Sequence, residues 1–402
     1  MSLNETPSAN RLHISFFGRR NAGKSSLVNA VTGQDLAVVS EVKGTTTDPV
    51  QKAMELLPIG PVLIIDTPGF DDDSGLLGEK RVERTRRILR KTDVAVLVVD
   101  ALLGLTGPDE ELLGLFKARG LNHLVVFNKC DLLPNLPVEA PGTIYVSAAT
   151  RDRIEEFKEK LAALAIGREP EPKIIGDLIE PSDFLVLVVP IDKAAPKGRL
   201  ILPQQQTIRD ILDAGGAPVV ARETELKGVL AGLLRPPRLV ITDSQVFDQV
   251  AADTPPEVPL TSFSILFARY KGFLDQAVHG VRALDRLAQG DQVLIAEGCT
   301  HHRQCEDIGT VKLPRWIRDR SGLNIDFIFT AGGDFPEDLS PYRLVIHCGA
   351  CMLNEREMKY RQRIASDQGA PFTNYGLAIA HLRGVLKRSL GLWPHLVAEL
   401  ES

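Results

Sequence analysis

A chain of 402 residues is too long for one ordinary domain, so two or three domains are expected. The formal net charge of -5 and the 5% of aromatic residues disfavour a nucleic-acid partner, which needs basic patches and stacking rings. No apolar run reaches the roughly 18 to 20 residues that cross a bilayer, and residues 1–10 lack the apolar core of a signal peptide. We therefore expect a cytoplasmic protein with no membrane partner.

The first strand-like run, residues 12–17, leads into GRRNAGKSS at residues 18–26 and then into a helix-like segment, residues 27–32. This is the pattern of a phosphate-binding loop in the strand–loop–helix context that it requires. The glycines let backbone amides close around phosphates, Lys24 would neutralise the β- and γ-phosphates, and the Ser25 hydroxyl would ligate magnesium. The predicted phosphate-binding residues are Gly18, Asn21, Ala22, Gly23, Lys24, Ser25 and Ser26.

Further strand-like runs follow, and three of them end in loops that suit a guanine nucleotide. The strand-like runs cover residues 62–65, 94–99, 124–127 and 143–146. The first ends in DTPG, where Asp66 is expected just outside the magnesium ligands and the Gly69 amide could bind the γ-phosphate. The third ends in NKCD, where the Asp131 carboxylate can accept two hydrogen bonds from guanine, a donor pair that adenine lacks. The predicted base-binding residues are Asn128, Lys129, Asp131, Ser147 and Ala148.

These loops and their spacing resemble the small GTPases of the TrmE–Era–Der group, with GTTTD at residues 44–48 as the first switch. The resemblance implies that Thr46 supplies a hydroxyl to magnesium and that Asn21 helps to hold a potassium ion beside the β,γ-bridge. Phe70, which follows DTPG, cannot orient water as a glutamine would. We therefore expect slow GTP hydrolysis that potassium stimulates. The predicted catalytic residues are Lys24, Thr46, Asp66 and Gly69.

A charged, proline-rich linker follows the first domain, for which we expect residues 1–168. Strand-like and helix-like runs then alternate, which predicts a small parallel α/β domain over residues 174–267. The strand-like runs cover residues 184–189, 218–221 and 239–242, and the helix-like runs cover residues 206–213 and 223–234. This domain shows no nucleotide fingerprint and no paired catalytic group, so we expect it to form the interface of a homodimer.

A third domain is predicted over residues 270–402. The strand-like runs cover residues 292–296, 325–329 and 344–346, and the helix-like runs cover residues 270–287, 354–366 and 377–386. Two of the strands end in cysteine sequences, GCTHH at residues 298–302 and HCGAC at residues 347–351. Because ligands gather at the carboxyl ends of parallel strands, Cys299, Cys348 and Cys351 are expected to meet at one centre.

Two kinds of metal centre suit three thiolates with a nearby histidine. One is a structural zinc ion, and the other is a 4Fe-4S cluster with one iron left open or held by a weaker ligand. The spacing of the cysteines does not separate these alternatives. Of the remaining two cysteines, Cys130 is expected to be a packed thiol and Cys305 a bystander.

The GTPase loops, the middle α/β domain and the two cysteine sequences together resemble the HydF family, the maturation scaffolds of FeFe-hydrogenases. The resemblance implies a 4Fe-4S cluster on Cys299, Cys348 and Cys351 with an exchangeable fourth position. It also implies that the chain carries a two-iron precursor with carbonyl and cyanide ligands to the apo FeFe-hydrogenase, with the maturases HydE and HydG as upstream partners. His301, His347 and Glu306 are candidates for the fourth ligand or for neighbouring positions, and the thiol of Cys305 is a further alternative.

Taken together, the fold class is expected to be α/β, with a P-loop GTPase domain followed by two smaller α/β domains for association and for the cluster. The leading functional hypothesis is a GTP-regulated iron–sulfur scaffold and carrier. An RNA- or ribosome-directed GTPase with a C-terminal structural zinc domain is the alternative, although the acidic net charge and few aromatic residues count against it. A cluster-dependent redox enzyme is a third interpretation, but no second cofactor motif is visible.

Overall fold

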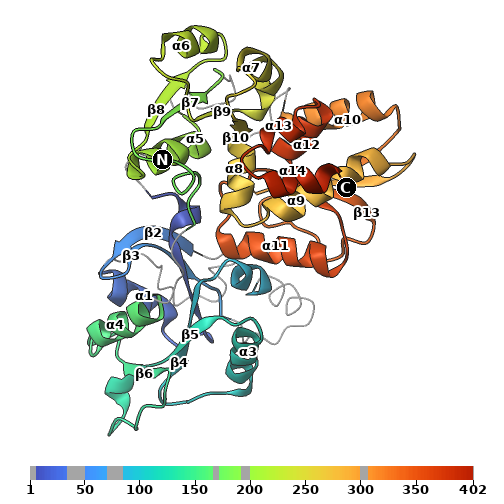
Figure 1. Ribbon diagram of the computed structural model, residues 1–402. Coiled ribbons are helices and arrows are strands. Elements are labelled where there is room, and N and C mark those ends of the chain that lie inside the picture. The colour runs from blue at the N-terminus through green and yellow to red at the C-terminus, as the bar shows by residue number, and fades with distance from the viewer. Residues whose placement is uncertain are drawn as a thin grey trace. The chain divides into compact units, whose positions relative to one another are not determined.

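The computed structural model describes residues 6–33, 50–69, 85–165, 172–191, 200–298 and 307–401. The chain divides into two compact units, Met1–Pro170 and Glu171–Ser402, and both are built from β-sheets and helices (Figure 1). The α/β fold class that the sequence predicts is therefore confirmed. No helix within the described ranges has the length and apolar character needed to cross a membrane.

One six-stranded sheet, in the order β2-β3-β1-β4-β5-β6, frames the first unit. All neighbouring strands are parallel except β2 and β3, which are antiparallel. The strands are β1 (Leu12–Phe17), β2 (Val50–Leu56), β3 (Gly60–Asp66), β4 (Val94–Asp100), β5 (Asn122–Asn128) and β6 (Thr143–Val146). The apolar runs of β1 and β4 are buried along almost their whole length, as expected for parallel strands covered on both faces.

Helices cover both faces of this sheet (Figure 1). Helices α1 (Lys24–Thr32) and α4 (Ile154–Ala165) pack on one face, where Leu27 and Phe157 enter one hydrophobic core. Helix α3 (Gly107–Ala118) and the helical residues 85–90 share the other core, in which the rings of Phe17 and Phe116 lie 5.3 Å apart. Because five strands run in parallel, the loops after them meet at the carboxyl edge of the sheet.

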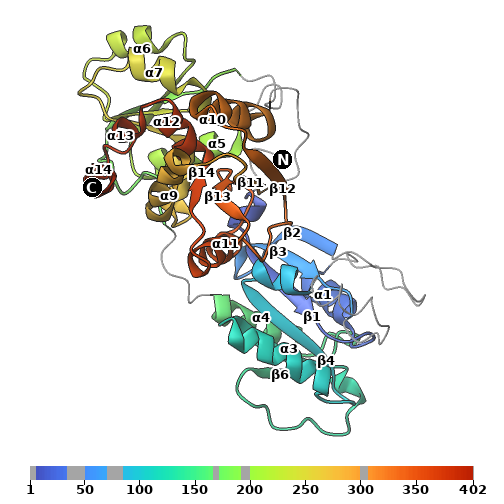
Figure 2. The ribbon, with the colours of Figure 1, turned by 90° about the vertical axis from the view of Figure 1, so that its right-hand side faces the viewer.

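The second unit contains two four-stranded parallel sheets, in the orders β10-β9-β7-β8 and β12-β11-β13-β14. The strands are β7 (Phe184–Val188), β8 (Ala217–Ala221), β9 (Leu239–Thr242), β10 (Leu260–Ser262), β11 (Gln292–Glu297), β12 (Asp326–Ala331), β13 (Tyr342–His347) and β14 (Phe372–Asn374). The second of these sheets lies among helices α9, α10, α11 and α12 (Figure 2). The helices are α5 (Leu202–Asp213), α6 (Leu226–Gly232), α7 (Phe247–Asp253), α8 (Phe263–Tyr270), α9 (Leu274–Val281), α10 (Leu313–Ser321), α11 (Glu355–Asp367), α12 (Tyr375–Leu382), α13 (Leu386–Ser389) and α14 (Pro394–Glu401).

One continuous hydrophobic core joins the two sheets of the second unit. It extends from Ile174 to Leu396 and includes Phe267 of α8 and Phe273 just before α9. The boundaries at residues 174–267 and 270–402 stay predictions, because the core runs through this region without a break.

The helix predicted over residues 270–287 is confirmed in part: it begins later, as α9, and continues as a 3-10 helix over Arg282–Arg286. Helix α8 ends at Tyr270, and Gly272 then takes a left-handed conformation with φ of +76° before α9 begins at Leu274. A similar break divides the helix predicted over residues 377–386, because Gly384 has φ of +73° between α12 and α13. In both segments the apolar periodicity continues across a glycine that ends the helix.

Candidate functional site

The phosphate-binding loop has the backbone conformation that its glycines predict. Gly18 has φ of +149°, and a Cβ atom there would lie 2.2 Å from the carbonyl oxygen of Val98 on β4. Gly23 has φ of +85° and directly precedes α1, so the free amides of the first helical turn face the loop. Asn21 also has a positive φ, of 60°. A loop of this shape presents successive backbone N–H groups to a bound anion.

Lys24, Ser25 and Asp66 lie close together at the phosphate-binding loop. The Lys24 ammonium donates hydrogen bonds to the carbonyl oxygens of Gly18 and Arg19, at 2.9 and 2.8 Å, and so lies within the loop. The Ser25 hydroxyl donates to Asp66 Oδ2 at 2.7 Å, whereas the buried Asp66 Oδ1 has no hydrogen-bond partner among the described residues. Burial raises the pKa of Asp66, against the opposing effects of Ser25 and the Lys24 charge. An unpaired carboxylate oxygen beside a serine hydroxyl fits hydrated magnesium.

The loop after β3 is fixed against the phosphate-binding loop. Both the amide and the hydroxyl of Thr67 donate to the carbonyl oxygen of Phe16, at 3.2 and 2.7 Å. A Cβ atom on Gly69 would lie 2.9 Å from the amide nitrogen of Arg20, so only glycine allows this approach. The structure therefore brings Gly69 beside the phosphate-binding loop. The switch residue Thr46 lies outside the described residues, and so does Phe70, which follows Gly69.

Asn128 joins the predicted base-binding loops to the phosphate-binding loop. Its amide nitrogen donates to the carbonyl oxygen of Ala22 at 3.0 Å, and its amide oxygen accepts from the amide of Ala148 at 3.0 Å. Lys129 has φ of +68° and forms a 2.6 Å ion pair with Asp100, the last residue of β4. Sequence reasoning missed Asp100, although an acidic residue at the carboxyl end of a neighbouring buried strand was a usable signal.

The remaining predicted base-binding residues lie in the loops that follow β5 and β6. The Asp131 carboxylate is exposed at the start of a short 3-10 turn, Cys130–Leu132. Ser147 is fully buried, and its hydroxyl accepts from the amide of Thr150 at 3.1 Å. Cys130 is buried, with its sulfur 3.9 Å from Asp152 Oδ2, and burial raises the pKa of its thiol. Cys130 therefore has the surroundings of a packed, unreactive thiol.

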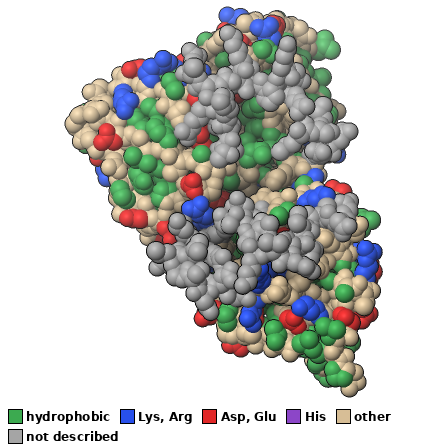
Figure 3. Space-filling model, turned by 180° about the vertical axis from the view of Figure 1, so that it is seen from behind, with side chains coloured by type: hydrophobic (Ala, Val, Ile, Leu, Met, Phe, Trp, Pro, Cys, Tyr) green, Lys and Arg blue, Asp and Glu red, His purple; other side chains and the backbone are tan. Residues whose placement is uncertain are grey.

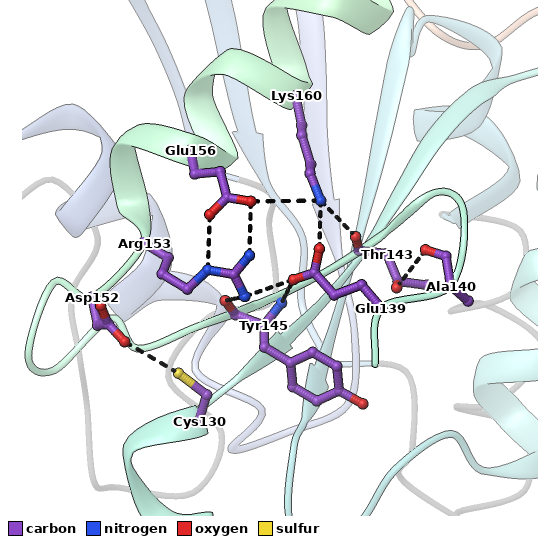
Figure 4. Close-up of polar contacts among 9 residues, drawn as sticks. All are labelled: Cys130, Glu139, Ala140, Thr143, Tyr145, Asp152, Arg153, Glu156 and Lys160. Atoms are coloured by element: carbon purple, nitrogen blue, oxygen red, sulfur yellow. Dashed lines mark hydrogen bonds and ion pairs between the residues drawn. The ribbon is translucent and has the colours of Figure 1, made fainter. Parts of the chain in front are cut away.

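An ionic network ties the segment that precedes β6 to helix α4 (Figure 4). Glu139 forms ion pairs with Arg153 at 2.6 Å and with Lys160 at 2.7 Å, and Arg153 also binds Glu156 at 2.7 Å. Burial alone would raise the pKa of Glu139, but hydrogen bonds from Lys160, Arg153 and the Tyr145 amide lower it to about 2. This network supports the loop that carries Ser147 and Ala148.

The network predicts a pH dependence of the stability of the first unit. Because the pKa of Glu139 falls from its usual 4.5 to about 2, its stabilisation is complete above pH 4.5 and is lost as the pH falls through 2. We expect Glu139→Gln to lower the free energy of unfolding by about 1–2 kcal/mol at pH 7, after allowance for solvent screening. Urea unfolding of both proteins at pH 7 and pH 3 measures this. The difference in free energy of unfolding between the two proteins should be smaller at pH 3 than at pH 7. A larger difference at pH 3 would contradict the low pKa of Glu139.

Cys348 lies at the carboxyl end of β13, and its sulfur accepts hydrogen bonds from the backbone. Its amide donates to the carbonyl oxygen of Ala296 on β11 at 2.9 Å, which extends the sheet by one bond. Its sulfur accepts hydrogen bonds from the amides of Gly298 at 3.1 Å and Ala350 at 3.4 Å. Burial raises the pKa of the thiol, while the two amides and the charge of Arg361 oppose that effect. Two N–H donors on one sulfur suit a thiolate that binds zinc or iron.

The rest of the predicted metal set is only partly described. Cys351 is half-buried in the same turn, and Gly298 directly precedes the predicted ligand Cys299. The predicted residues Cys299, His301, Cys305 and Glu306 lie outside the described residues. Within the described part of the chain, no group of three or more His, Cys, Asp or Glu side chains could hold a metal ion.

His347 is fully buried beside Cys348, and both of its ring nitrogens are hydrogen-bonded. Nδ1 lies 2.9 Å from the carbonyl oxygen of Cys348, and Nε2 lies 2.9 Å from Nη1 of Arg361. Burial, together with the charge of Arg361, lowers the pKa of His347 to about 3. The sequence analysis missed Arg361 and its partner Glu357. These two residues are four positions apart, so they lie on the same face of α11. The apolar residues Met358 and Ala365 on that face indicated that it is buried.

The sheet, its two helical layers and the loops around Lys24, Asp66 and Asn128 define the first unit as a P-loop GTPase domain, which implies binding of GTP and magnesium. In agreement, residues 13–129 match the family model described as 50S ribosome-binding GTPase. Residues 174–272 match the dimerization domain of hydrogen maturase F, and residues 275–392 match its tetramerization domain. The chain belongs to the hydrogen maturase F (HydF) family.

The chain is also similar to curated GTPases of other families. The chain is 30% identical to GTPase Der of Kosmotoga olearia, over 54% of each chain. It is 38% identical to the tRNA modification GTPase MnmE of a Synechococcus strain, over 40% of this chain and 35% of the relative. The chain thus spans about half or less of the length of these relatives.

Solved structures with related parts include a probable GTP-binding protein engB and Era of Aquifex aeolicus. The first is 25% identical with a TM-score of 0.32, over 39% of this chain and all of that chain. The second is 20% identical with a TM-score of 0.35, over 52% of this chain and 93% of that chain.

Proposed function

We propose that this chain is a GTP-hydrolysing scaffold that holds a 4Fe-4S cluster on Cys299, Cys348 and Cys351. Its cargo is a two-iron precursor with carbonyl and cyanide ligands, which it delivers to apo FeFe-hydrogenase in the cytoplasm. The maturases HydE and HydG act upstream of it. The observation that carries the proposal is the sulfur of Cys348, which accepts two backbone N–H bonds in a chain whose second unit matches both hydrogen maturase F domains.

GTP hydrolysis at the first unit rests on positioning and electrostatics. Lys24 turns from the loop carbonyls to the β- and γ-phosphates, and the Gly69 amide donates to the γ-phosphate. Ser25 and Thr46 would hold a magnesium ion, with Asp66 accepting hydrogen bonds from its water ligands, and the ion would supply positive charge against the phosphates. Asp131 selects guanine, while Asn128 keeps the base-binding and phosphate-binding loops in register.

Potassium is expected to accelerate hydrolysis. Asn21 sits at the bend of the phosphate-binding loop with φ of +60° and an exposed side chain, so its amide oxygen is available to a cation beside the β,γ-bridge. Turnover of GTP in potassium buffer should exceed that in sodium buffer at equal ionic strength, by about tenfold if the cation supplies ~1.4 kcal/mol to the transition state. Asn21→Ala should abolish the difference. Equal turnover in the two buffers would refute the assignment.

The cluster itself is tested by anaerobic reconstitution with iron and sulfide. We expect a brown protein with absorption near ~400 nm and about four irons per chain. Replacing Cys348 with serine should remove most of the iron, and so should replacing Cys299 or Cys351. The matched control is Cys130→Ser, which alters a buried thiol in the GTPase unit and should leave the iron content unchanged. Full iron content in Cys348→Ser would refute the ligand assignment.

The alternative is an RNA- or ribosome-directed GTPase with a structural zinc domain, which the names of the GTPase relatives suggest. That protein would be colourless after reconstitution, with one zinc per chain. On the face seen in Figure 3, the Lys and Arg side chains of described residues are interspersed with Asp and Glu, which favours the scaffold over an RNA-binding surface.

Self-association of the chain is supported by the matches to a dimerization and a tetramerization domain. The two sheets of the second unit each end in a strand with exposed apolar side chains, Val220 on β8 and Ile328 on β12. Unpaired apolar edges of this kind are suited to contacts between copies. We propose a homodimer as the basic assembly.

A further inference from the structure

Arg361 is the largest fully buried side chain among the described residues, and it lies next to the predicted cluster loop. Its guanidinium donates to three separate segments: Nε to Glu357 at 2.9 Å, Nη1 to His347 at 2.9 Å and Nη2 to the carbonyl oxygen of Gly332 at 2.5 Å. The guanidinium also lies 4.9 Å from the centre of the Phe335 ring. One side chain thus joins the carboxyl ends of β12 and β13 to helix α11.

The hydrogen bonds of Arg361 fix the state of His347. An arginine can only donate, so Nε2 of His347 must accept, and the ring proton must sit on Nδ1. Nδ1 then donates to the carbonyl oxygen of Cys348 at 2.9 Å. With one nitrogen accepting from Arg361 and the other bonded to the backbone, neither nitrogen is available to iron. A chain of hydrogen bonds therefore runs from Glu357 through Arg361 and His347 to the carbonyl oxygen of Cys348.

Buried charge of this kind acts on the sulfur as well as on the backbone. The side chain of Arg361 is 1% exposed and that of Glu357 is 7% exposed, so water screens them weakly. The positive charge of Arg361 acts on Cys348 in the direction that favours a thiolate, whereas the buried carboxylate of Glu297 on β11 acts in the opposite direction. A cluster bound to that sulfur would feel the same potentials, which help to set its reduction potential.

We propose that Arg361 is a positioning residue of the metal centre. It holds the turn at Cys348 through a neutral His347, and its charge raises the electrostatic potential at the cluster. His347 is then a spacer between arginine and backbone, and the fourth iron ligand comes from elsewhere. This inference rests on the proposed function, because it needs a cluster on Cys348. Glu357 is the counter-charge that keeps Arg361 buried.

Midpoint potentials of the reconstituted full-length protein test the charge. Dithionite supplies one electron to the cluster, and the reduced fraction is followed by electron paramagnetic resonance. We expect Arg361→Met to shift the midpoint to more negative values and Glu357→Gln to shift it to more positive values. Arg361→Lys, which keeps the charge, should lie near the wild type. The control Arg363→Met, at an exposed position on the same helix, should not shift it.

Opposite shifts cannot arise from loosening alone, because both substitutions break the same buried ion pair. Midpoint potentials that shift with the same sign in both variants, or that do not shift, would overturn the proposal. If Arg361→Met does not fold, the midpoint potentials of Glu357→Gln and Arg361→Lys test the proposal instead. Nitrogen hyperfine couplings of the reduced cluster should be unchanged in His347→Gln, and loss of a coupling there would identify His347 as a ligand. A wild-type protein that binds no cluster refutes the proposed function, and this inference with it, whereas a normal cluster with unshifted variants refutes only this inference.

Discussion

Asp131→Asn is expected to lower the affinity for GTP by about 10²- to 10⁴-fold and to create binding of xanthosine triphosphate. The carboxylate offers two acceptors to the N1 and N2 donors of guanine. An asparagine replaces one acceptor with an NH₂ donor, which then faces the amino group of guanine. Xanthine carries a carbonyl oxygen in place of that amino group, so the new donor finds an acceptor. Titration calorimetry with both nucleotides measures the exchange.

The structure makes this substitution a clean test of base recognition. Asp131 is exposed and lies at the start of a short 3-10 turn, so an asparagine there buries no unpaired group. Glu111→Gln, at an exposed position on α3, makes the same change in net charge and should leave both affinities unchanged. Unaltered GTP affinity in Asp131→Asn would show that another residue reads the base.

The loops of the candidate nucleotide site could be located from the sequence, because each is marked by residues that are close together in the chain. Except for the switch at residues 44–48, each predicted loop directly follows a buried parallel strand, and such strands appear as continuous apolar runs. The contacts between loops could not be predicted in the same way. The bond from Asn128 to Ala22 spans 106 positions, and Asp100 meets Lys129 only because β4 and β5 are neighbours in the sheet.

The second unit shows where a sequence pattern misleads. Strands β10 and β14 contain three residues each, too few to produce a recognisable period, and both were missed. Arg361 was missed for a different reason, since an arginine on a helix is expected to face solvent. Its burial depends on Glu357, His347 and the carbonyl of Gly332, and those partners meet only after the sheet has formed.

Gly23→Ala is expected to reduce nucleotide affinity by at least about 100-fold, through two effects that add. A non-glycine residue at φ of +85° costs roughly 1–2 kcal/mol. The new Cβ would also lie 2.1 Å from the amide nitrogen of Asn128, so that side chain must move and lose its bonds to Ala22 and Ala148. Each such bond contributes about 1 kcal/mol, and its loss separates the base-binding loop from the phosphate-binding loop.

Gly33→Ala is the matched control, at the other end of the same helix. Gly33 has φ of +66°, but no atom of the described residues lies within 4 Å of a Cβ atom placed there. It therefore carries the backbone strain without the collision, and we expect a loss of about 1 kcal/mol in stability with nearly unchanged nucleotide affinity. Fluorescent GTP-analogue binding and thermal unfolding of both variants separate the two effects. Similar affinity losses in the two variants would mean that strain in α1, and not the contact between Gly23 and Asn128, controls the site.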